Sequence, residues 1–241
     1  MMDKILSVSN LTKRFIMHLL NEKVIRGCSN ISFDLYKGEL LGITGPSGAG
    51  KSCILKCIYR TYMPTEGKIL YNSNSEGMVD LASAPDDMII ELREKEIAHV
   101  TQFLHTIPRV TVLNLIAGEL INKGVPENEA MLETRSLLAE MRISENLWDA
   151  YPSTLSGGEQ QRINIAKSFI SKPRLLLLDE PTASLDSKSR DIVVKLIKKL
   201  KNSGTTIIGV FHDIETMKMV ADKVLDVTEK QIREVTKELV V

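Results

Sequence analysis

Aromatic residues are scarce in this chain. Only 5% of the 241 residues are Phe, Trp or Tyr, and there is a single tryptophan. The core must therefore be built mainly from aliphatic side chains. Hydrophobic residues at 43% and charged residues at 26% are ordinary proportions for a globular protein. A chain of this length fits one large domain or two lobes that share a site.

Cysteine is also rare, and its count is odd. Cys28, Cys53 and Cys57 show no ladder of paired spacings, which indicates a reducing compartment. Cys53 and Cys57 lie four residues apart on a predicted helix and resemble half of a metal site. No Cys or His lies near them in the sequence to complete one. We expect the three thiols to act as small apolar side chains.

Long apolar runs and an excess of one charge are missing too. The N-terminus lacks an uninterrupted apolar segment, and no run approaches the ~20 apolar residues of a membrane span. Lys+Arg and Asp+Glu are both 31, so the formal net charge is zero. Bulk charge therefore gives no attraction to nucleic acid. We expect a cytoplasmic protein without direct membrane insertion, whose contact with a membrane would need a partner.

Apolar runs alternate with helical patterns along most of the chain. Strands are predicted for LLGITG (40–45), RLLLLDEPT (174–182) and TTIIGVF (205–211). The four consecutive leucines of the second are typical of a strand buried on both faces. Helices are predicted at 53–62, at 187–203 with Gly204 as the stop, and from His212 onward. This succession predicts a parallel α/β sheet.

Two regions depart from that alternation. The first 39 residues hold alternating stretches such as ILSVSNL and NISFDLY, which favour a small antiparallel sheet. Between Gln102 and Leu155 the pattern is mainly helical, most clearly in EAMLETRSLLAEMR. We expect one unit over 1–241, with a core lobe at about 1–102 and 156–241 and a helical subdomain at about 103–155.

The most specific motif is GPSGAGKS, from Gly45 to Ser52. It matches G-x-x-x-x-G-K-[ST] between a predicted strand and a predicted helix, which is the setting of a phosphate-binding P-loop. Glycines let successive amides turn inward around an anion, and the helix N-terminus adds positive potential. Lys51 would supply a charge to the β- and γ-phosphates, and the Ser52 hydroxyl would bind Mg²⁺. The alternative, a Gly/Ser-rich turn with an incidental lysine, leaves the strand–loop–helix setting unexplained.

Charged and polar side chains follow the other predicted strands. Asp179 is placed to hold Mg²⁺ through water and Glu180 to point at an attacking water, because ligands of α/β sheets lie beyond the carboxyl ends of strands. The alternative for both is a solvated acidic strand end closed by Pro181. His212 reaches the same crevice, although a lone histidine is more often structural. Asp213 has the position of a cap for the next helix.

The segment LSGGEQQR, from Leu155 to Arg162, begins a helix in an unusual way. Ser156 and Glu159 have the spacing of a capping box. Gly157 and Gly158 disfavour helix and leave the backbone amides bare. Bare amides at a helix N-terminus suit an anion, yet no phosphate-binding lysine follows. The segment alone does not show whose phosphate it would bind.

Taken together, these segments resemble the motifs of the ATP-binding-cassette (ABC) ATPases. GPSGAGKS is similar to their Walker A, VTQF (100–103) to their Q-loop and LSGGEQQR to their signature. LLLLDEP (175–181) is similar to their Walker B, ASLD (183–186) to their D-loop and VFHD (210–213) to their H-loop. All six occur in the family's order. Phe15 in LTKRF is similar in position to the family's aromatic residue that stacks on adenine, where tyrosine is common.

The resemblance implies an α/β nucleotide-binding domain. Its P-loop core would have a parallel sheet, an N-terminal antiparallel β-subdomain and an inserted helical subdomain. It also implies ATP and Mg²⁺, with catalytic roles for Glu180, His212 and Gln102 and metal ligands Ser52, Gln102 and Asp179. The implied nucleotide-binding residues are Phe15, Gly45, Pro46, Ser47, Gly48, Ala49, Gly50, Lys51, Ser52 and Cys53.

One of these residues departs from the family pattern. Cys53 stands where many members have threonine, and loss of that hydroxyl would weaken a contact to the α-phosphate. Because the loop amides remain, we do not expect the change to abolish binding.

In this family two nucleotide-binding domains pair head to tail, and each signature closes over ATP held by the partner. The signature residues that would act on the partner's ATP are Leu155, Ser156, Gly157, Gly158, Glu159 and Gln160. The D-loop residues would be Ser184, Leu185 and Asp186. This explains a phosphate-type helix start without its own lysine. The implied partner is a second ABC subunit, either another copy or a sister protein.

The segments between the motifs resemble one group of ABC proteins, the PhnL family of the phosphonate carbon–phosphorus lyase system. They are VDLASAP (79–85), VTQFLHTIPRVTVLNL (100–115) and NLWDAYPSTLSGGEQQRINIAKSFI (146–170). This resemblance implies the lyase core complex and the sister protein PhnK as partners. It also links the chain to formation of ribose 1-methylphosphonate 5-triphosphate.

Two other functions remain open. An ATPase subunit of a lipoprotein- or macrolide-export transporter would need a membrane partner docked near Phe103 to Arg109. An ABC ATPase acting on DNA or ribosomes would carry coiled-coil insertions or twin cassettes. The sequence has neither, so we expect no nucleic-acid partner.

Overall fold

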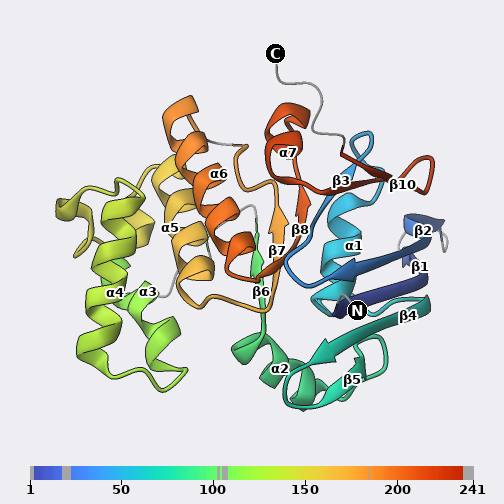
Figure 1. Cartoon of the computed structure of the whole chain (residues 1–241), viewed down its shortest axis with the longest axis horizontal. Coiled ribbons are helices and arrows are strands. Elements are labelled where there is room, and N and C mark those ends of the chain that lie inside the picture. Colours follow the sequence, from blue (N-terminus) through green and yellow to red (C-terminus); the bar gives the residue numbers. More distant parts are fainter. Residues whose placement is uncertain (1–2, 18–22, 102–103, 105–107, 184, 236–241) are drawn as a thin grey trace.

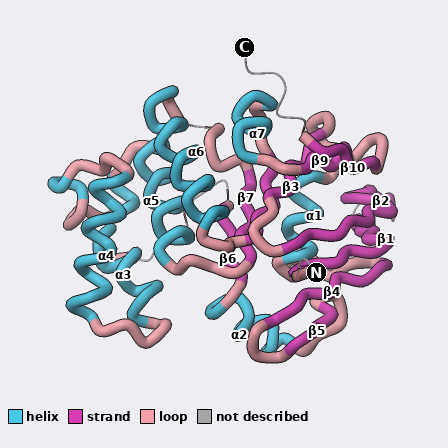
Figure 2. The backbone as a smooth tube through the Cα atoms, viewed as in Figure 1, coloured by secondary structure: helices cyan, strands magenta, loops and turns pink. Residues whose placement is uncertain are grey.

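Two β-sheets and a group of helices make up the chain. This computed structural model describes residues 3–17, 23–101, 104, 108–183 and 185–235. Helices α3 and α4 lie at one end of the molecule and the strands β1, β2, β4 and β5 at the other, with the second sheet between them (Figures 1 and 2). Among the described helices, none combines the length and the apolar character needed to cross a bilayer.

The larger sheet has the strand order β10-β9-β3-β8-β7-β6. Every pairing in it is parallel except that of β10 with β9. The expected parallel α/β sheet is thereby confirmed, although β6, β9 and β10 were not predicted. The strands are β3 (Leu40–Thr44), β6 (Ile97–Val100), β7 (Leu175–Asp179), β8 (Thr206–Val210), β9 (Lys223–Asp226) and β10 (Gln231–Glu234).

Strand β7 is buried on both faces, as its leucine run predicts. Leu175 and Leu177 pack into a cluster that includes helix α1 (Lys51–Ile58) and the N-terminal strands. Leu176 and Leu178 pack into the opposite cluster, with helices α5 (Gly157–Ile170) and α6 (Ser187–Asn202). Successive side chains of a strand point to opposite faces. The sheet therefore separates α1 from α5 and α6, as Figure 1 shows.

The second sheet is antiparallel, with the order β2-β1-β4-β5. Strands β1 (Lys4–Met17) and β2 (Lys23–Tyr36) form the long hairpin expected from the first 39 residues. Strands β4 (Glu66–Ser73) and β5 (Gly77–Asp80) join it from beyond the P-loop. The sequence shows the hairpin but not this addition, because the pairing of β1 with β4 spans more than 50 residues.

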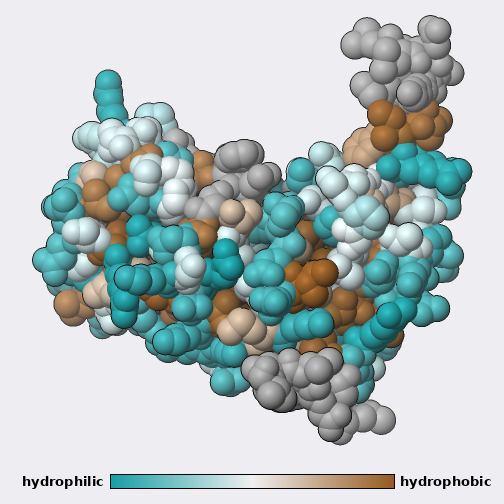
Figure 3. Space-filling view, turned by 90° about the horizontal axis from the view of Figure 1, so that it is seen from above, coloured by the Kyte–Doolittle hydropathy of each residue, from teal (hydrophilic) through white to brown (hydrophobic). Residues whose placement is uncertain are grey.

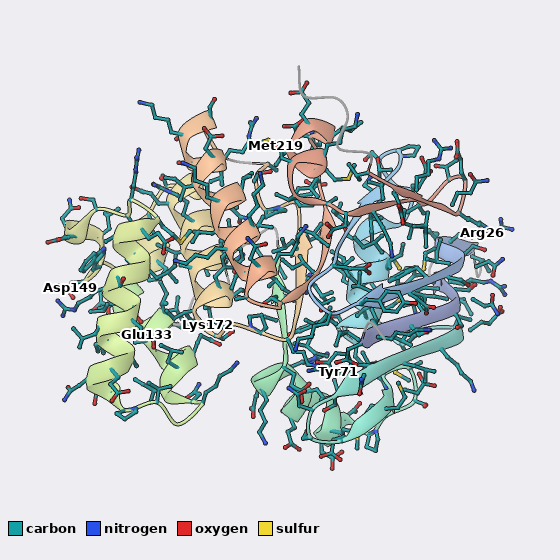
Figure 4. The ribbon with its side chains drawn as sticks, viewed as in Figure 1. Arg26, Tyr71, Glu133, Asp149, Lys172 and Met219 are labelled. Atoms are coloured by element: carbon teal, nitrogen blue, oxygen red, sulfur yellow. The ribbon has the colours of Figure 1, made fainter. Side chains whose placement is uncertain are left out.

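The region between 102 and 155 is mainly helical, as expected. Helices α3 (Val112–Ile121) and α4 (Glu127–Glu140) pack on each other and on α5. Two short 3-10 helices follow, Glu145–Leu147 and Pro152–Thr154. An ion pair of 3.3 Å between Glu133 of α4 and Lys172, just after α5, links these helices to the core (Figure 4).

Helix α1 is shorter than the predicted 53–62 because the chain turns at Arg60. Arg60 has a φ of 64°, in the left-handed region that ends helices. Its guanidinium donates to the Leu81 carbonyl at 2.8 Å and the Ala84 carbonyl at 3.2 Å. The helix is thus exchanged for a clamp on residues 81–84. The other helices are α2 (Asp86–Lys95) and α7 (Ile214–Val220).

A buried hydrogen-bond network joins the antiparallel sheet to the start of β6. The Glu96 carboxylate accepts from the Tyr71 hydroxyl at 2.8 Å, the Ser73 hydroxyl at 2.8 Å and the Asn74 amide at 3.0 Å. Tyr71 is fully buried, and Glu96 is buried beside it (Figure 4 labels Tyr71). A buried charge is tolerated when such donors satisfy it.

We expect Tyr71→Phe to lower the free energy of unfolding by about 1–2 kcal/mol, because the buried carboxylate loses one donor while the ring packing is kept. Urea unfolding followed by circular dichroism measures this change. The matched control is Tyr151→Phe, at a side chain that is 48% exposed, which should change stability by less than about 0.5 kcal/mol. Equal stability of Tyr71→Phe and wild type would contradict the role given to the network.

Candidate active site

The P-loop connects β3 to α1 and uses glycine where the backbone demands it. Gly48 and Gly50 have φ values of 76° and 92°, which glycine adopts without strain. At Gly50 a Cβ would lie 1.7 Å from the Gly27 carbonyl oxygen, so no other residue fits. Gly50 is also the residue before α1, where it has no side chain to cap the helix. The first-turn amides of α1 are therefore left for an anion.

Lys51 and Ser52 open helix α1 and lie at the carboxyl edge of the sheet. The Lys51 ammonium donates to the Gly45 carbonyl at 2.8 Å and the Pro46 carbonyl at 2.9 Å, so it spans the mouth of the loop. The Ser52 hydroxyl donates to Asp179 Oδ1 at 2.8 Å. This bond joins two predicted site residues that are 127 positions apart in the sequence.

Asp179 ends β7 as a buried carboxylate. Burial raises its pKa above the usual range, while the hydrogen bond from Ser52 and the nearby Lys56 oppose that rise. A buried carboxylate next to a hydroxyl oxygen is the donor set that Mg²⁺ prefers, and a cation there would offset the cost of desolvation. The residues present therefore fit the expected metal.

Glu180 follows directly, in a strained backbone conformation. Its φ of 52° is unusual for a residue with a side chain and costs on the order of 1 kcal/mol. The Glu180 amide donates to the Val210 carbonyl of β8 at 2.9 Å, which ties this turn to the neighbouring strand. The side chain is half-buried. Strain of this kind concentrates at functional sites, and nothing in the sequence revealed it.

His212 and Asp213 follow β8 at the same edge of the sheet. His212 is exposed two residues beyond Val210, whose register partner on β7 is Asp179. Asp213 caps α7, accepting from the Glu215 amide at 2.9 Å and the Thr216 hydroxyl at 2.7 Å. These bonds hold the pKa of Asp213 below its usual range. The expected cap is confirmed.

Phe15 lies on β1, and a second aromatic residue meets it. The Tyr62 ring is 5.1 Å from the Phe15 ring, edge to face at 82°. Both pack at the rim of the core cluster that also receives Ala49 of the P-loop. Sequence reasoning missed Tyr62, because a tyrosine after a helix carries no motif of its own.

Cys53 turns into the core. Its side chain is buried, and a hydrogen bond with the Cys28 thiol, together with burial, raises the pKa of Cys53 to about 12. The thiol is thus protonated and engaged with its neighbours. It does not replace the hydroxyl that a threonine would supply, and the expected loss of an α-phosphate contact stays a prediction.

The signature segment forms the predicted helix start. The Ser156 hydroxyl accepts from the Glu159 amide, and the Glu159 carboxylate accepts from the Ser156 amide at 2.9 Å, which completes the capping box. These bonds from Ser156 hold the pKa of Glu159 below its usual range. Ser156 and Gly157 are exposed, and a Cβ at Gly157 would meet no atom within 4 Å. The start of α5 is therefore an open surface.

Helix α5 is tied to two strand ends of the sheet. The Gln161 side chain donates to the Pro181 carbonyl at 3.5 Å, just after Glu180. The Asn164 side chain donates to the Thr101 carbonyl at 2.7 Å, just after β6. Nearby, Asp186 caps α6 by accepting from the Ser189 amide at 2.8 Å. The signature helix and the D-loop turn are thus held against the elements that carry Asp179 and Glu180.

Two predicted site residues, Gln102 and Ser184, lie outside the described residues. Leu185 of the D-loop is buried and Leu155 of the signature half-buried. A cleft of about 760 Å³ runs from Ser52 and Asp179 along β6 toward the ends of α2 and α5.

Comparison with known proteins agrees with this geometry. The family model of the ABC transporter matches residues 28–183. The arginine transport ATP-binding protein ArtP of Haemophilus influenzae is 37% identical, over 85% of this chain and 84% of that protein. The lipoprotein-releasing system ATP-binding protein LolD of Colwellia psychrerythraea is 33% identical, over 88% of this chain and 80% of that protein.

Solved structures match over nearly the whole chain. The ATP-binding cassette MJ0796, as a dimer in a post-hydrolysis state bound to ADP and Pi, has a TM-score of 0.85 at 28% identity. The match covers 96% of this chain and 99% of that one. The expected ABC ATPase fold is confirmed. The chain belongs to the ABC transporter family, as an ATP-hydrolysing nucleotide-binding domain.

Proposed function

We propose that this ATPase works in a head-to-tail pair, with a second copy or a sister ABC subunit. The observation that carries the proposal is the separation of the P-loop helix α1 from the signature helix α5 by the sheet. The exposed amides at Gly157 would not reach the chain's own P-loop across that sheet. They suit the γ-phosphate of ATP bound to the partner, and MJ0796 is a dimer. Leu185 and Asp186 of the D-loop would lie near the same joint.

Within such a pair the residues have distinct roles. The P-loop amides and Lys51 bind the phosphates, and Phe15 stacks on the base. Glu180 holds the attacking water and accepts its proton, while His212 contacts the γ-phosphate. Ser52 and Asp179, with Gln102, would hold Mg²⁺, which neutralises charge on the phosphates. Closure of the pair excludes other water.

The two lobes are part of the same proposal. We propose that residues at about 103–155 form a helical subdomain that carries the signature toward the partner, distinct from the core lobe. Three lysines of the core pair with glutamates of α3 and α4 across the joint. They are Lys167 with Glu119 at 3.3 Å, Lys172 with Glu133 at 3.3 Å and Lys199 with Glu140 at 2.9 Å. Exposed pairs of this kind are weak, so the joint can open and close.

We infer that the pair serves the carbon–phosphorus lyase system, as a PhnL-like cytoplasmic component. The segments that resemble the PhnL family have defined places: 79–85 is the segment clamped by Arg60, and 146–152 holds the buried Trp148 beside the signature. The implied partners are the lyase core complex and PhnK. The implied chemistry is formation of ribose 1-methylphosphonate 5-triphosphate.

A second candidate is an export transporter subunit. LolD matches well, and the macrolide export ATP-binding/permease protein MacB of Vibrio parahaemolyticus is 30% identical over 96% of this chain and 34% of that protein. Both names describe export systems. The partner at the 103–109 region would then be a membrane permease.

Affinity purification of the tagged protein, followed by mass spectrometry, separates these functions. Lyase subunits among the partners, enriched over a tagged Lys51→Ala control, are expected. Recovery of a membrane permease without lyase subunits would replace the first candidate with the second.

We expect Glu180→Gln to bind ATP normally while hydrolysis falls by about 100-fold or more, because the amide cannot accept the proton from water. It should accumulate as an ATP-bound dimer. Phosphate release measures turnover and gel filtration with ATP measures the dimer. Near-normal turnover by this variant would exclude Glu180 as the base.

Ser156→Arg tests whether the signature acts on the partner's ATP. We expect ATP binding by the monomer to remain, since that ATP rests on Lys51 and Ser52, but hydrolysis to be lost because an arginine blocks closure. Lys51→Ala should lose binding as well. A mixture of the two variants forms one composite site without either defect, so activity should partly return. If the serine is only a helix cap, Ser156→Arg costs about 1 kcal/mol of stability and leaves hydrolysis near normal.

A further inference from the structure

Tyr62 and Phe15 form an aromatic pair at the edge of the P-loop. Their rings meet edge to face, with centroids 5.1 Å apart, in the range that stabilises such pairs. Phe15 comes from β1 and Tyr62 from the turn after α1, so the pair bridges the antiparallel sheet and the P-loop helix. The Tyr62 amide donates to the Lys56 carbonyl at 3.0 Å, which fixes this turn to α1.

Gly27 fixes the distance between Phe15 and the P-loop. A Cβ at this position would lie 2.8 Å from Phe15 Cε2 and 2.6 Å from Cys53 Sγ, so only glycine lets the ring approach. The Gly27 carbonyl oxygen lies against Gly50. Phe15 is thereby seated beside the residues that open α1, where the base of a bound nucleotide must lie.

Two lysines lie over the rings of the pair. The Lys13 ammonium is 5.0 Å from the centre of the Phe15 ring, and the Lys56 ammonium is 5.6 Å from that of Tyr62. Cation–π attraction holds each ammonium next to the aromatic surface. The base site is thus bordered by positive charge that suits an anionic nucleotide.

Without Tyr62 the Phe15 ring has another apolar surface to cover. Its register partner on β2 is Ile25, which is 42% exposed on the same side of the hairpin. Side chains directly opposite each other on an antiparallel pair are in contact range. A ring freed from Tyr62 can turn toward Ile25 and lose its orientation for stacking.

We propose that Tyr62 is a positioning residue for base binding: its ring holds Phe15 in the orientation that stacks on the base of the bound nucleotide. This inference rests on the base-stacking role proposed for Phe15. Stacking does not distinguish between bases, because every base presents a π-face. Tyr62 therefore supports the affinity for ATP and GTP alike, and it has no effect on the triphosphate part.

Calorimetric titration of the full chain with ATP, GTP and inorganic tripolyphosphate tests the proposal. Tyr62→Ala is expected to raise the Kd for ATP and for GTP by about tenfold, as loss of one base stack does, with the Kd for tripolyphosphate unchanged. Tyr62→Phe keeps the ring and should restore both nucleotide affinities. Phe15→Ala should reproduce the effect of Tyr62→Ala, and the double variant should add little to either.

The matched control is Tyr36→Ala. Tyr36 is also half-buried and has the Lys223 ammonium 5.3 Å over its ring, but it lies at the far end of β2. It should leave all three Kd values unchanged. An unchanged ATP Kd in Tyr62→Ala beside a weakened Phe15→Ala would overturn the inference and leave the role of Phe15 intact. Unchanged affinity in both would overturn base stacking itself. Equal weakening toward ATP and tripolyphosphate would show a damaged P-loop instead, and would also overturn the inference.

Discussion

Strand β7 is buried on both faces, and most of the molecule is arranged by that constraint. Its leucines point alternately into two clusters, one containing α1 and the other α5 and α6. Parallel neighbours on each side bring the carboxyl ends of β3, β7 and β8 to one edge. The P-loop, Asp179 and His212 gather at that edge because their strands end there. The same sheet separates the signature from the P-loop, so the site is completed by a second subunit in the function proposed here.

The carboxylates of the molecule are treated in different ways. Glu96 is buried but accepts hydrogen bonds from three groups, so its role is structural. Asp179 is buried with one hydroxyl donor and has a raised pKa, which leaves it suited to a cation. Glu180 is half-buried on a strained backbone. The cost accepted at Asp179 and Glu180 is offset by packing elsewhere, as is common where a site must be preorganised.

The surface is consistent with work through partners. Seen from above, hydrophilic and hydrophobic residues are interspersed on the face in Figure 3. The helical region is joined to the core by Lys–Glu pairs at its surface as well as by the packing of α3 on α5. A joint of this kind can transmit closure of a nucleotide site to a neighbouring protein, whether a lyase subunit or a permease.

The sequence by itself determined the local chemistry. The P-loop, the capping box of Ser156, the cap at Asp213 and the doubly buried leucine strand each depend on residues close together in the chain. These features were predicted, and the structure shows them. Tertiary structure alone decided the bond between Ser52 and Asp179, the addition of β4 and β5 to the hairpin, the clamp by Arg60 and the ring of Tyr62 against Phe15. Each of these contacts joins segments far apart in sequence, and neither periodicity nor motif spacing records which distant segments meet. Only the packing of the two sheets around α1 brings them together.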